Sequence, residues 1–259
     1  MNEYAERFPG LVKHYKNERN LGIYGNLLAG YKRATGNVIA TLSGDDEYVD
    51  GCFETAVKFI EKHDILDKVF HVYFNRRRHF ADNRPDYTFR NNLVLSPRRL
   101  SFALRHYICE PTFFSPKLLD RCVPPINLGK CGDVYWCLSR MFYSDVVLFC
   151  DSTSVVYNAG IGVSVTASLR KTRESEKLVF QKILNENEMG FKHKDLNYVK
   201  YQLYRSESYF NPSLKHVFMS TLMFFKGVDL SLGWRYTGLT EHVKYLFRYL
   251  PYVLKNKSI

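Results

Sequence analysis

The sequence is organised around the stretch Gly36-Asn37-Val38-Ile39-Ala40-Thr41-Leu42-Ser43-Gly44-Asp45-Asp46. Its five residues Val38–Leu42 are apolar or β-branched and predict a buried strand. Ser43 and Gly44 interrupt the pattern, and Asp45 and Asp46 follow where the strand would end. Open α/β sheets bind ligands at the carboxyl ends of their strands. The pair is therefore a candidate hard-oxygen site for Mg²⁺ or Mn²⁺ carrying a phosphate. An acidic turn before a helix N-terminus is the alternative.

Residues upstream of the strand extend this pattern in a fixed order. Asn20-Leu21-Gly22 is followed by Asn26 and then by a short helical segment, Leu27–Ala34, that ends at Thr35-Gly36. The order resembles the inverting family-2 glycosyltransferases of the A-type nucleotide-sugar fold. Their pattern is N-x-G-x-x-x-N, then A-x-G-x-x-[IV], then a strand ending in a D-x-D metal motif. The residues on this pattern are Asn20, Gly22, Asn26, Ala34, Gly36, Asp45 and Asp46, whereas Ser43 stands where many members carry Asp.

The resemblance, which covers roughly residues 20–164, implies both a fold and a reaction. The fold is α/β, a mostly parallel sheet with helices on both faces as in nucleotide-diphospho-sugar transferases. The reaction moves a sugar from a nucleotide-sugar donor to an acceptor hydroxyl with inversion. The implied donor contacts are Asn20, Gly22, Asn26 and Asp45. The implied ligands of a Mg²⁺ or Mn²⁺ ion on the diphosphate are Asp45 and Asp46.

A second acidic position lies further along the chain, at Gly132-Asp133. The apolar residues Val134, Leu138 and Met141 follow at helical spacing, so Asp133 lies at the start of a predicted helix. Family members carry Glu-Asp or Gly-Asp here, and the resemblance implies that Asp133 is the general base that takes the proton of the acceptor hydroxyl. The alternative is an aspartate that only caps the helix.

The segments between these motifs predict further helices and strands. Tyr48–His63 has an apolar face at helical spacing, and Val69–Phe74 alternates as a strand does. The basic stretch from Asn75 to about Asn92 is interpreted as a solvated loop, with an arginine cluster near donor phosphates or anionic lipid as the alternative. Residues 146–157 predict a β-hairpin or two edge strands. Asn158 follows, where the family often carries an arginine.

The segment before Asn20 is shorter than the corresponding segment of the family that the sequence resembles. Only 19 residues precede Asn20, and they predict a helix from Tyr4 that leads into a strand around Val12–Lys16. The family has a strand, a helix and a second strand there, a unit of about 30 residues or more. The chain is therefore expected to be N-terminally truncated relative to the family. A catalytically inactive remnant is accordingly a second hypothesis for function.

The sequence changes character after residue 166. Residues 1–166 predict the glycosyltransferase-like catalytic domain, and residues 167–259 predict a helical extension rich in basic and aromatic side chains. Within it, Thr240–Lys257 resembles an interfacial helix. A helix packed on the domain is the alternative.

Composition limits the partners. The chain has 259 residues, 46% of them hydrophobic, and a net charge of +11. This charge favours anions such as nucleotide phosphates and anionic lipid. A basic nucleic-acid-binding protein is a third hypothesis, but the charge is spread along the chain and no binding module is recognised, so no nucleic-acid partner is expected.

The sequence also leads to expectations about the location of the protein and about its acceptor. The six cysteines have no zinc spacing and are interpreted as reduced thiols of a cytoplasmic protein. The start has no signal-peptide core, and no apolar run has the length of a spanning helix. The resemblance implies a lipid-linked or saccharide acceptor in bacterial surface-polysaccharide assembly. We therefore expect a cytoplasmic protein, peripheral on the inner face of the membrane.

Overall fold

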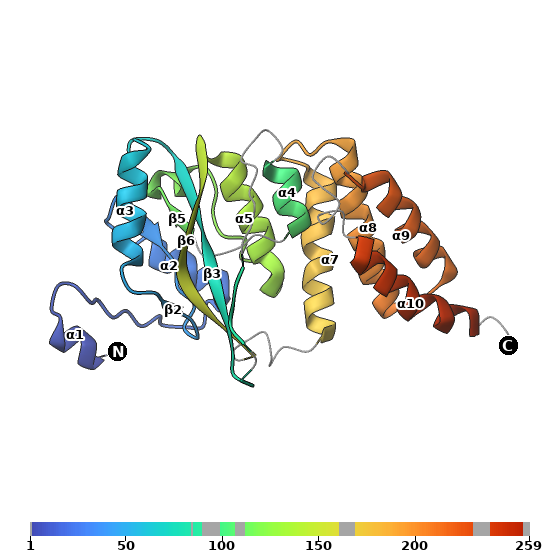
Figure 1. The fold of residues 1–259 in the computed structure, drawn as a ribbon, viewed down its shortest axis with the longest axis horizontal. Helices are drawn as coiled ribbons and strands as arrows, with labels where there is room; N and C mark the ends of the chain where they lie inside the picture. Colours follow the sequence, from blue (N-terminus) through green and yellow to red (C-terminus); the bar gives the residue numbers. More distant parts are fainter. Residues whose placement is uncertain are drawn as a thin grey trace.

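The computed structural model describes residues 2–83, 85–89, 99–106, 112–160, 169–229 and 239–255. A sheet with helices on both faces comes first, and a stack of further helices follows (Figure 1). The strands are β1 (Ile39–Ala40), β2 (Glu47–Tyr48), β3 (Phe70–Phe80), β4 (Tyr87–Phe89), β5 (Thr112–Phe114) and β6 (Val146–Ala159). The α-helices are α1 (Asn2–Arg7), α2 (Gly22–Tyr31), α3 (Cys52–Lys62), α4 (Arg99–His106), α5 (Gly132–Tyr143), α7 (Leu169–Glu186), α8 (His193–Phe210), α9 (Leu214–Gly227) and α10 (Leu239–Lys255). The 3₁₀ helices are η1 (Pro116–Asp120) and η2 (Gly129–Cys131).

The sheet is mixed. Its strand order is β1-β5-β3-β6-β2, with β4 beside the far end of β3. β3 and β6 pair in parallel, whereas β5 is antiparallel to both β1 and β3, so β1, β3 and β6 all run in one direction. The predicted α/β class is confirmed. The sheet is not mostly parallel, however, because β5, β2 and β4 each run against the strand they pair with.

Alternating side chains of β3 divide the core between the two faces. Phe70, Val72 and Phe74 pack with Ile60 of α3 on one face, whereas Tyr73 points to the other face and packs with α5 and the helices beyond it. Figure 1 shows α3 on one side of the sheet and α5 on the other. This two-fold alternation is the ordinary consequence of the strand pleat.

The predicted loop from Asn75 onward is wrong at its start. β3 continues through the basic residues to Phe80, paired with β4 on one side and with β6 on the other. Their alternating half-buried and exposed positions match a strand with one covered face. Polarity indicated a solvent face, but the flanking strands supply backbone partners that a loop would lack.

The predicted hairpin in residues 146–157 is also wrong. β6 is one strand in which Cys150 pairs with Phe74 and Thr153 pairs with Asn75. The residues between them, Asp151 and Ser152, form a bulge rather than a turn, because the chain resumes the same direction beside β3. The side-chain amide of Asn75 donates to the carbonyl oxygen of Asp151 at 2.8 Å and holds the bulge.

The N-terminal segment does not form the expected strand. After α1 the chain is irregular, and β1 is the first strand among the described residues. Leu11, just before the predicted strand at Val12–Lys16, is 81% exposed. No described strand pairs with this segment, so its backbone lacks the ladder that a strand needs.

The C-terminal helices share a core with the sheet. One cluster of buried side chains joins Tyr73 of β3 and Met141 of α5 to Phe180 of α7, Val199 of α8 and Phe224 of α9. The proposed boundary at 166/167 lies outside the described residues and stays a prediction. Among the described helices, none combines the length and apolar content needed to cross a bilayer.

The described cysteines are free thiols. Cys52, Cys137 and Cys150 are buried, whereas Cys122 and Cys131 are half-buried. Desolvation raises the pKa of Cys122 to about 12 and that of Cys131 to about 11. These values make the two thiols poor nucleophiles at neutral pH. Cys109 lies outside the described residues.

A buried ion pair connects α4 to the helical stack. The guanidinium of Arg105 donates to Asp195 Oδ1 at 2.7 Å, and the two side chains are 2% and 7% exposed. Arg105 also donates to the carbonyl oxygen of Gly227 at 2.7 Å, and Ser101 donates to Asp195 Oδ2 at 2.7 Å. The pair thus ties together α4, α8 and α9.

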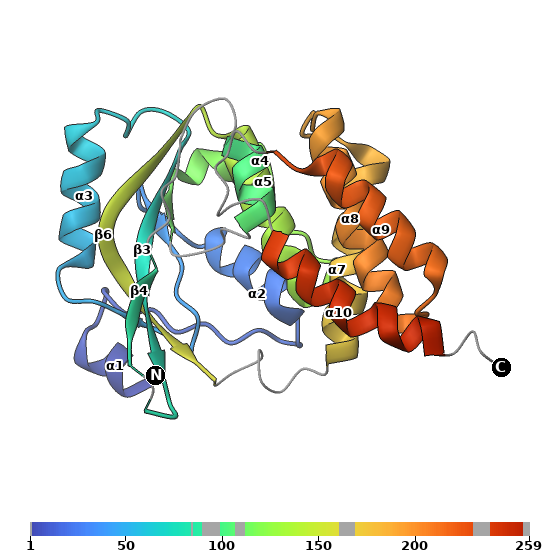
Figure 2. The same ribbon diagram turned by 45° about the vertical axis from the view of Figure 1, so that its right-hand side comes forward.

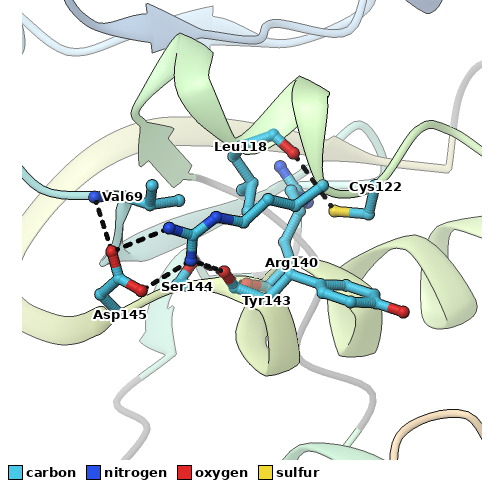
Figure 3. Close-up of polar contacts among 8 residues, drawn as sticks. Val69, Leu118, Cys122, Arg140, Tyr143, Ser144 and Asp145 are labelled. Carbon is cyan, nitrogen blue, oxygen red and sulfur yellow. Dashed lines mark hydrogen bonds and ion pairs between the residues drawn. The ribbon is translucent and has the colours of Figure 1, made fainter.

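An exposed ion pair provides a contrast (Figure 3). Arg121 donates to both carboxylate oxygens of Asp145, at 2.6 and 3.2 Å, and to the carbonyl oxygen of Tyr143 at 2.9 Å. Asp145 also accepts a bond from the backbone N–H of Val69. The contacts join the end of η1 to the turn between α5 and β6, but both side chains are more than 40% exposed.

Candidate active site

A cavity of about 550 Å³ lies where the chain leaves β1. Because β1, β3 and β6 run in one direction, their carboxyl ends face the same edge of the sheet. The cavity is built from α2, the acidic loop after β1, β3, α5 and β6. Its charged lining residues are Asp45, Asp46, Asp133, Arg76, Lys130 and Arg140, and its aromatic ones are Tyr24, Trp136 and Tyr157. Anionic and cationic groups therefore share one concave surface with aromatic rings.

The two aspartates of the loop after β1 are held by Asn158 at the end of β6. The backbone N–H of Asn158 donates to Asp46 Oδ1 at 3.1 Å, and its side-chain amide donates to the carbonyl oxygen of Asp45 at 2.7 Å. The backbone N–H of Asp46 donates to the carbonyl oxygen of Ser43, which closes the turn. Asn158, where the family resemblance led us to expect an arginine, thus fixes the acidic loop to the sheet.

The environment of Asp46 favours a nearby cation. Burial raises the pKa of the Asp46 carboxyl above its usual value, and the negative charge of Asp45 raises it further. The bond from Asn158 and the positive charge of Arg76 act in the opposite direction. A positive ion next to this carboxylate would relieve the cost of its partial desolvation.

Asp133 lies in the first turn of α5 and lines the same cavity. Cys131 occupies the N-cap position and makes no side-chain bond there, so Asp133 is the second residue of the helix and not its N-cap residue. Asp133 Oδ1 accepts a bond from the backbone N–H of Val134 at 2.9 Å, and the side chain is exposed to the cavity. A carboxylate in this position can accept a proton from a bound molecule.

A glycine allows this helix start to lie against α2. A Cβ on Gly132 would come within 2.8 Å of the ring of Tyr24. The hydroxyl of Tyr24 donates to the carbonyl oxygen of Lys130 at 2.9 Å. The close packing of this ring against residue 132 positions Asp133 at the edge of the cavity.

The three predicted donor contacts before β1 divide into two groups. Asn26 lines the cavity, and its side-chain oxygen accepts a bond from Asn17 at 2.7 Å. Asn20 and Gly22 are not among the lining residues. Asn20 Oδ1 accepts from the N–H of Gly22 at 2.8 Å, and Gly22 has a φ of +69°, so both form the turn that begins α2. Their contact with a donor stays a prediction.

Arg76 belongs to the basic stretch for which an arginine cluster near donor phosphates was the alternative to a solvated loop, and no single arginine was selected from the sequence. It lines the cavity, and its guanidinium lies over the ring of Tyr157, 5.0 Å from the centroid. Arg78, two residues on, lies 5.5 Å from the same ring. Arg77 is on the opposite face, 3.8 Å from Asp86. Because side chains alternate along a strand, Arg77 could have been assigned to the face opposite Arg76 and Arg78 if the stretch had been predicted as a strand.

Arg140 and Lys130 were also missed. Arg140 is 1% exposed, donates to Thr112 Oγ1 at 2.9 Å, and lies near the rings of Phe114 and Trp136. Most residues around Arg140 in α5 are apolar, so the sequence did not indicate that this helix places a charged side chain in the wall of a cavity. Lys130 lies in η2, directly before α5.

The fold and the cavity together define a protein of the A-type nucleotide-sugar transferase fold. Residues 1–122 match the family model described as Glycosyl transferase family 2. This part of the chain is therefore similar to the family-2 glycosyltransferases. A search of curated proteins found no match.

Solved structures of S. aureus TarS are similar in fold. The complex of TarS 1–349 with UDP-GlcNAc superposes with a TM-score of 0.54 at 13% identity, covering 97% of this chain and 68% of that one. TarS 1–349 without the nucleotide sugar gives a TM-score of 0.48 at 13% identity, covering 82% of this chain and 61% of that one. The present chain thus spans less than two thirds of the latter structure.

Proposed function

We propose that this chain transfers a sugar from a nucleotide-sugar donor to an acceptor hydroxyl, with inversion at the anomeric carbon. The observation that carries the proposal is one cavity in which Asp45 and Asp46, the arginine Arg76 and the carboxylate Asp133 are brought together from three separate segments. A diphosphate needs cationic partners, and a hydroxyl nucleophile needs a base. The family match of residues 1–122 supports this assignment.

A divalent ion fits this cavity when the donor is bound. Asp46 is a partly desolvated carboxylate beside a second carboxylate, which suits a hard cation. No cluster of three acidic, histidine or cysteine side chains occurs in the described part of the chain. Mg²⁺ bound through one or two carboxylates plus phosphate oxygens is the arrangement that needs no third protein ligand. Asp45 and Asp46 would hold Mg²⁺ or Mn²⁺, which supplies positive charge to the leaving diphosphate.

The raised pKa of Asp46 predicts a pH dependence. Only the ionised carboxylate binds a cation well, so metal-assisted binding of a nucleoside diphosphate should weaken as pH falls through this pKa. The loss should begin at a higher pH than for an ordinary aspartate. Titrations of uridine, guanosine and thymidine diphosphates with Mn²⁺ at a series of pH values would check this. A flat profile down to the usual aspartate range would contradict it.

Arg76 is expected to bind donor phosphate. Hydrogen bonds to charged groups contribute about 1.5–3 kcal/mol, so Arg76→Gln should weaken nucleoside diphosphate binding by about ten-fold or more. Arg77→Gln is the matched control, because it removes the same charge one residue away on the other face of β3. Calorimetric titration of both variants measures the difference. Equal losses would assign the effect to overall charge rather than to a contact.

The acceptor is proposed as a saccharide or a lipid-linked sugar of surface-polysaccharide assembly. A cytoplasmic location, peripheral on the inner face of the membrane, accompanies this proposal. The family resemblance and the exposed aromatic side chains of the C-terminal helices support it.

The transfer reaction is tested by incubating the chain with Mn²⁺, a panel of nucleotide sugars and saccharide or lipid-linked acceptors. The expected result is release of nucleoside diphosphate that requires an acceptor. A product whose anomeric configuration, measured by NMR, is opposite to that of the donor is expected as well. Release of nucleoside diphosphate at the same rate with and without every acceptor would contradict the proposal, and so would a product with retained configuration. Salt-dependent binding of random oligonucleotides without any nucleotide-sugar binding would favour the nucleic-acid alternative instead.

A further inference from the structure

The last helix of the chain has two distinct faces. Tyr245 and His242 of α10 are buried against the helical stack: the Tyr245 hydroxyl lies 2.6 Å from Ser208 Oγ, and the His242 ring stacks on Phe224 at 4.3 Å between centroids. The orientation of α10 about its own axis is therefore fixed. Figure 2 shows α9 and α10 at the edge of the molecule farthest from α3.

A second face of α10 is apolar and exposed. Val243, Phe247, Leu250 and Leu254 are 41%, 78%, 37% and 55% exposed. Their spacing of four, three and four residues places them within about 60° around a helix of 3.6 residues per turn. They therefore form one continuous stripe, and Phe247 is its most exposed residue.

The neighbouring helix repeats this pattern. Phe218 and Phe225 of α9 are 64% and 65% exposed and lie seven residues apart, two turns along one side of the helix. α9 and α10 pack against each other. Exposed large aromatic side chains therefore occur on both helices of the same edge.

Cations accompany the exposed apolar residues. Lys244 and Arg248 of α10 each come directly after a residue of the stripe in the sequence. Lys215 and Lys226 lie on α9, and all four basic side chains are exposed. Glu241 is the acidic residue of α10, and its carboxylate is bonded to Lys244 at 2.8 Å. The charge of this edge is thus positive, which is the complement of an anionic surface.

We propose that the edge formed by α9 and α10 binds the surface of an anionic lipid bilayer. Helices of this kind lie in the headgroup plane, with the apolar side chains in the acyl boundary and the basic ones at the lipid phosphates. Each basic residue near an anionic membrane contributes about 1 kcal/mol. A second copy of the chain fits less well, because pairing the same edges would bring their cations together. The stripe is also narrow against the 1,200–2,000 Å² or so that a stable dimer interface buries.

The test is co-sedimentation of the full chain with vesicles of phosphatidylglycerol and phosphatidylcholine, and with phosphatidylcholine alone. The expected result is binding that requires phosphatidylglycerol and weakens as salt rises. Phe247→Glu and, separately, Phe218→Glu should each lower the bound fraction by about ten-fold. Leu66→Glu is the matched control, because it places the same charge on an exposed leucine four residues after the end of α3. α3 lies at the opposite end of the molecule from α9 and α10 (Figure 1).

Three outcomes would overturn this proposal. The first is no enrichment on anionic vesicles at low salt. The second is equal loss in the Leu66→Glu control. The third is a dimer in analytical ultracentrifugation that Phe247→Glu dissociates, which would assign the edge to a second copy. Thermal melting verifies that each variant is folded. The assay uses neither donor nor acceptor, so its outcome is independent of the proposed transfer reaction.

Discussion

Replacing Asp133 with asparagine is expected to lower the rate of sugar transfer by about 10²-fold or more, the low end of general-base contributions. Asparagine keeps the size of the side chain and an oxygen that can accept the bond from the N–H of Val134. The start of α5 should therefore be unchanged. Initial rates with saturating donor and acceptor measure the effect, together with calorimetric titration of the donor.

Donor binding and melting temperature serve as the controls for Asp133→Asn. Both should stay near the wild-type values, because the substitution removes a proton acceptor and leaves the helix start intact. A variant that turns over like the wild type would show that Asp133 has only a structural role in the first turn. A variant that loses donor affinity instead of rate would place Asp133 in the binding of the donor.

The second large effect is on stability. Asp195→Ala should lower the free energy of unfolding by about 3–5 kcal/mol, because it leaves the guanidinium of Arg105 buried without its carboxylate. For a chain of this size, that loss corresponds to a fall in melting temperature of about 10 °C. Chemical and thermal unfolding followed by circular dichroism measure both quantities.

Two further variants separate burial from ion pairing as such. The double variant Arg105→Met with Asp195→Leu should recover much of the loss, since apolar side chains of similar volume replace both charges. Asp145→Ala breaks an exposed pair with Arg121 and should change the melting temperature little. A large effect of Asp145→Ala, or a mild one of Asp195→Ala, would contradict the assignment of α4–α8 packing to the buried pair.

Local patterns predicted the elements that depend on neighbours in sequence. The helix after Gly132 was expected from periodicity and is α5. The strand before Asp45 was expected over Val38–Leu42 and forms only over Ile39–Ala40, and the helix expected over Leu27–Ala34 forms over Gly22–Tyr31. The pairing of strands was not expected, because the insertion of β5 between β1 and β3 depends on contacts far apart in the chain. The same holds for the bulge at Asp151, which has the composition of a turn.

The candidate site shows the same limit. Asp45, Asp46, Asp133 and Asn26 were predicted, and they line one cavity. The basic run that contains Arg76 was interpreted as a solvated loop, because a charged run usually indicates a solvent face, and an arginine cluster near donor phosphates was only the alternative. The structure places Arg76 over the ring of Tyr157. Asn158 holds the acidic loop through two hydrogen bonds between residues more than 100 positions apart in the sequence, so local patterns could not predict them.

The proposed reaction requires that this cavity binds a nucleoside diphosphate through a metal held by Asp45 and Asp46. Calorimetric titration of nucleoside diphosphates, with Mn²⁺ and with a chelator, tests it most directly. We expect clearly tighter binding with Mn²⁺ for the wild-type chain, and no such difference for Asp46→Asn at a nearly unchanged melting temperature. Equal affinity with Mn²⁺ and with chelator in the wild type would contradict it.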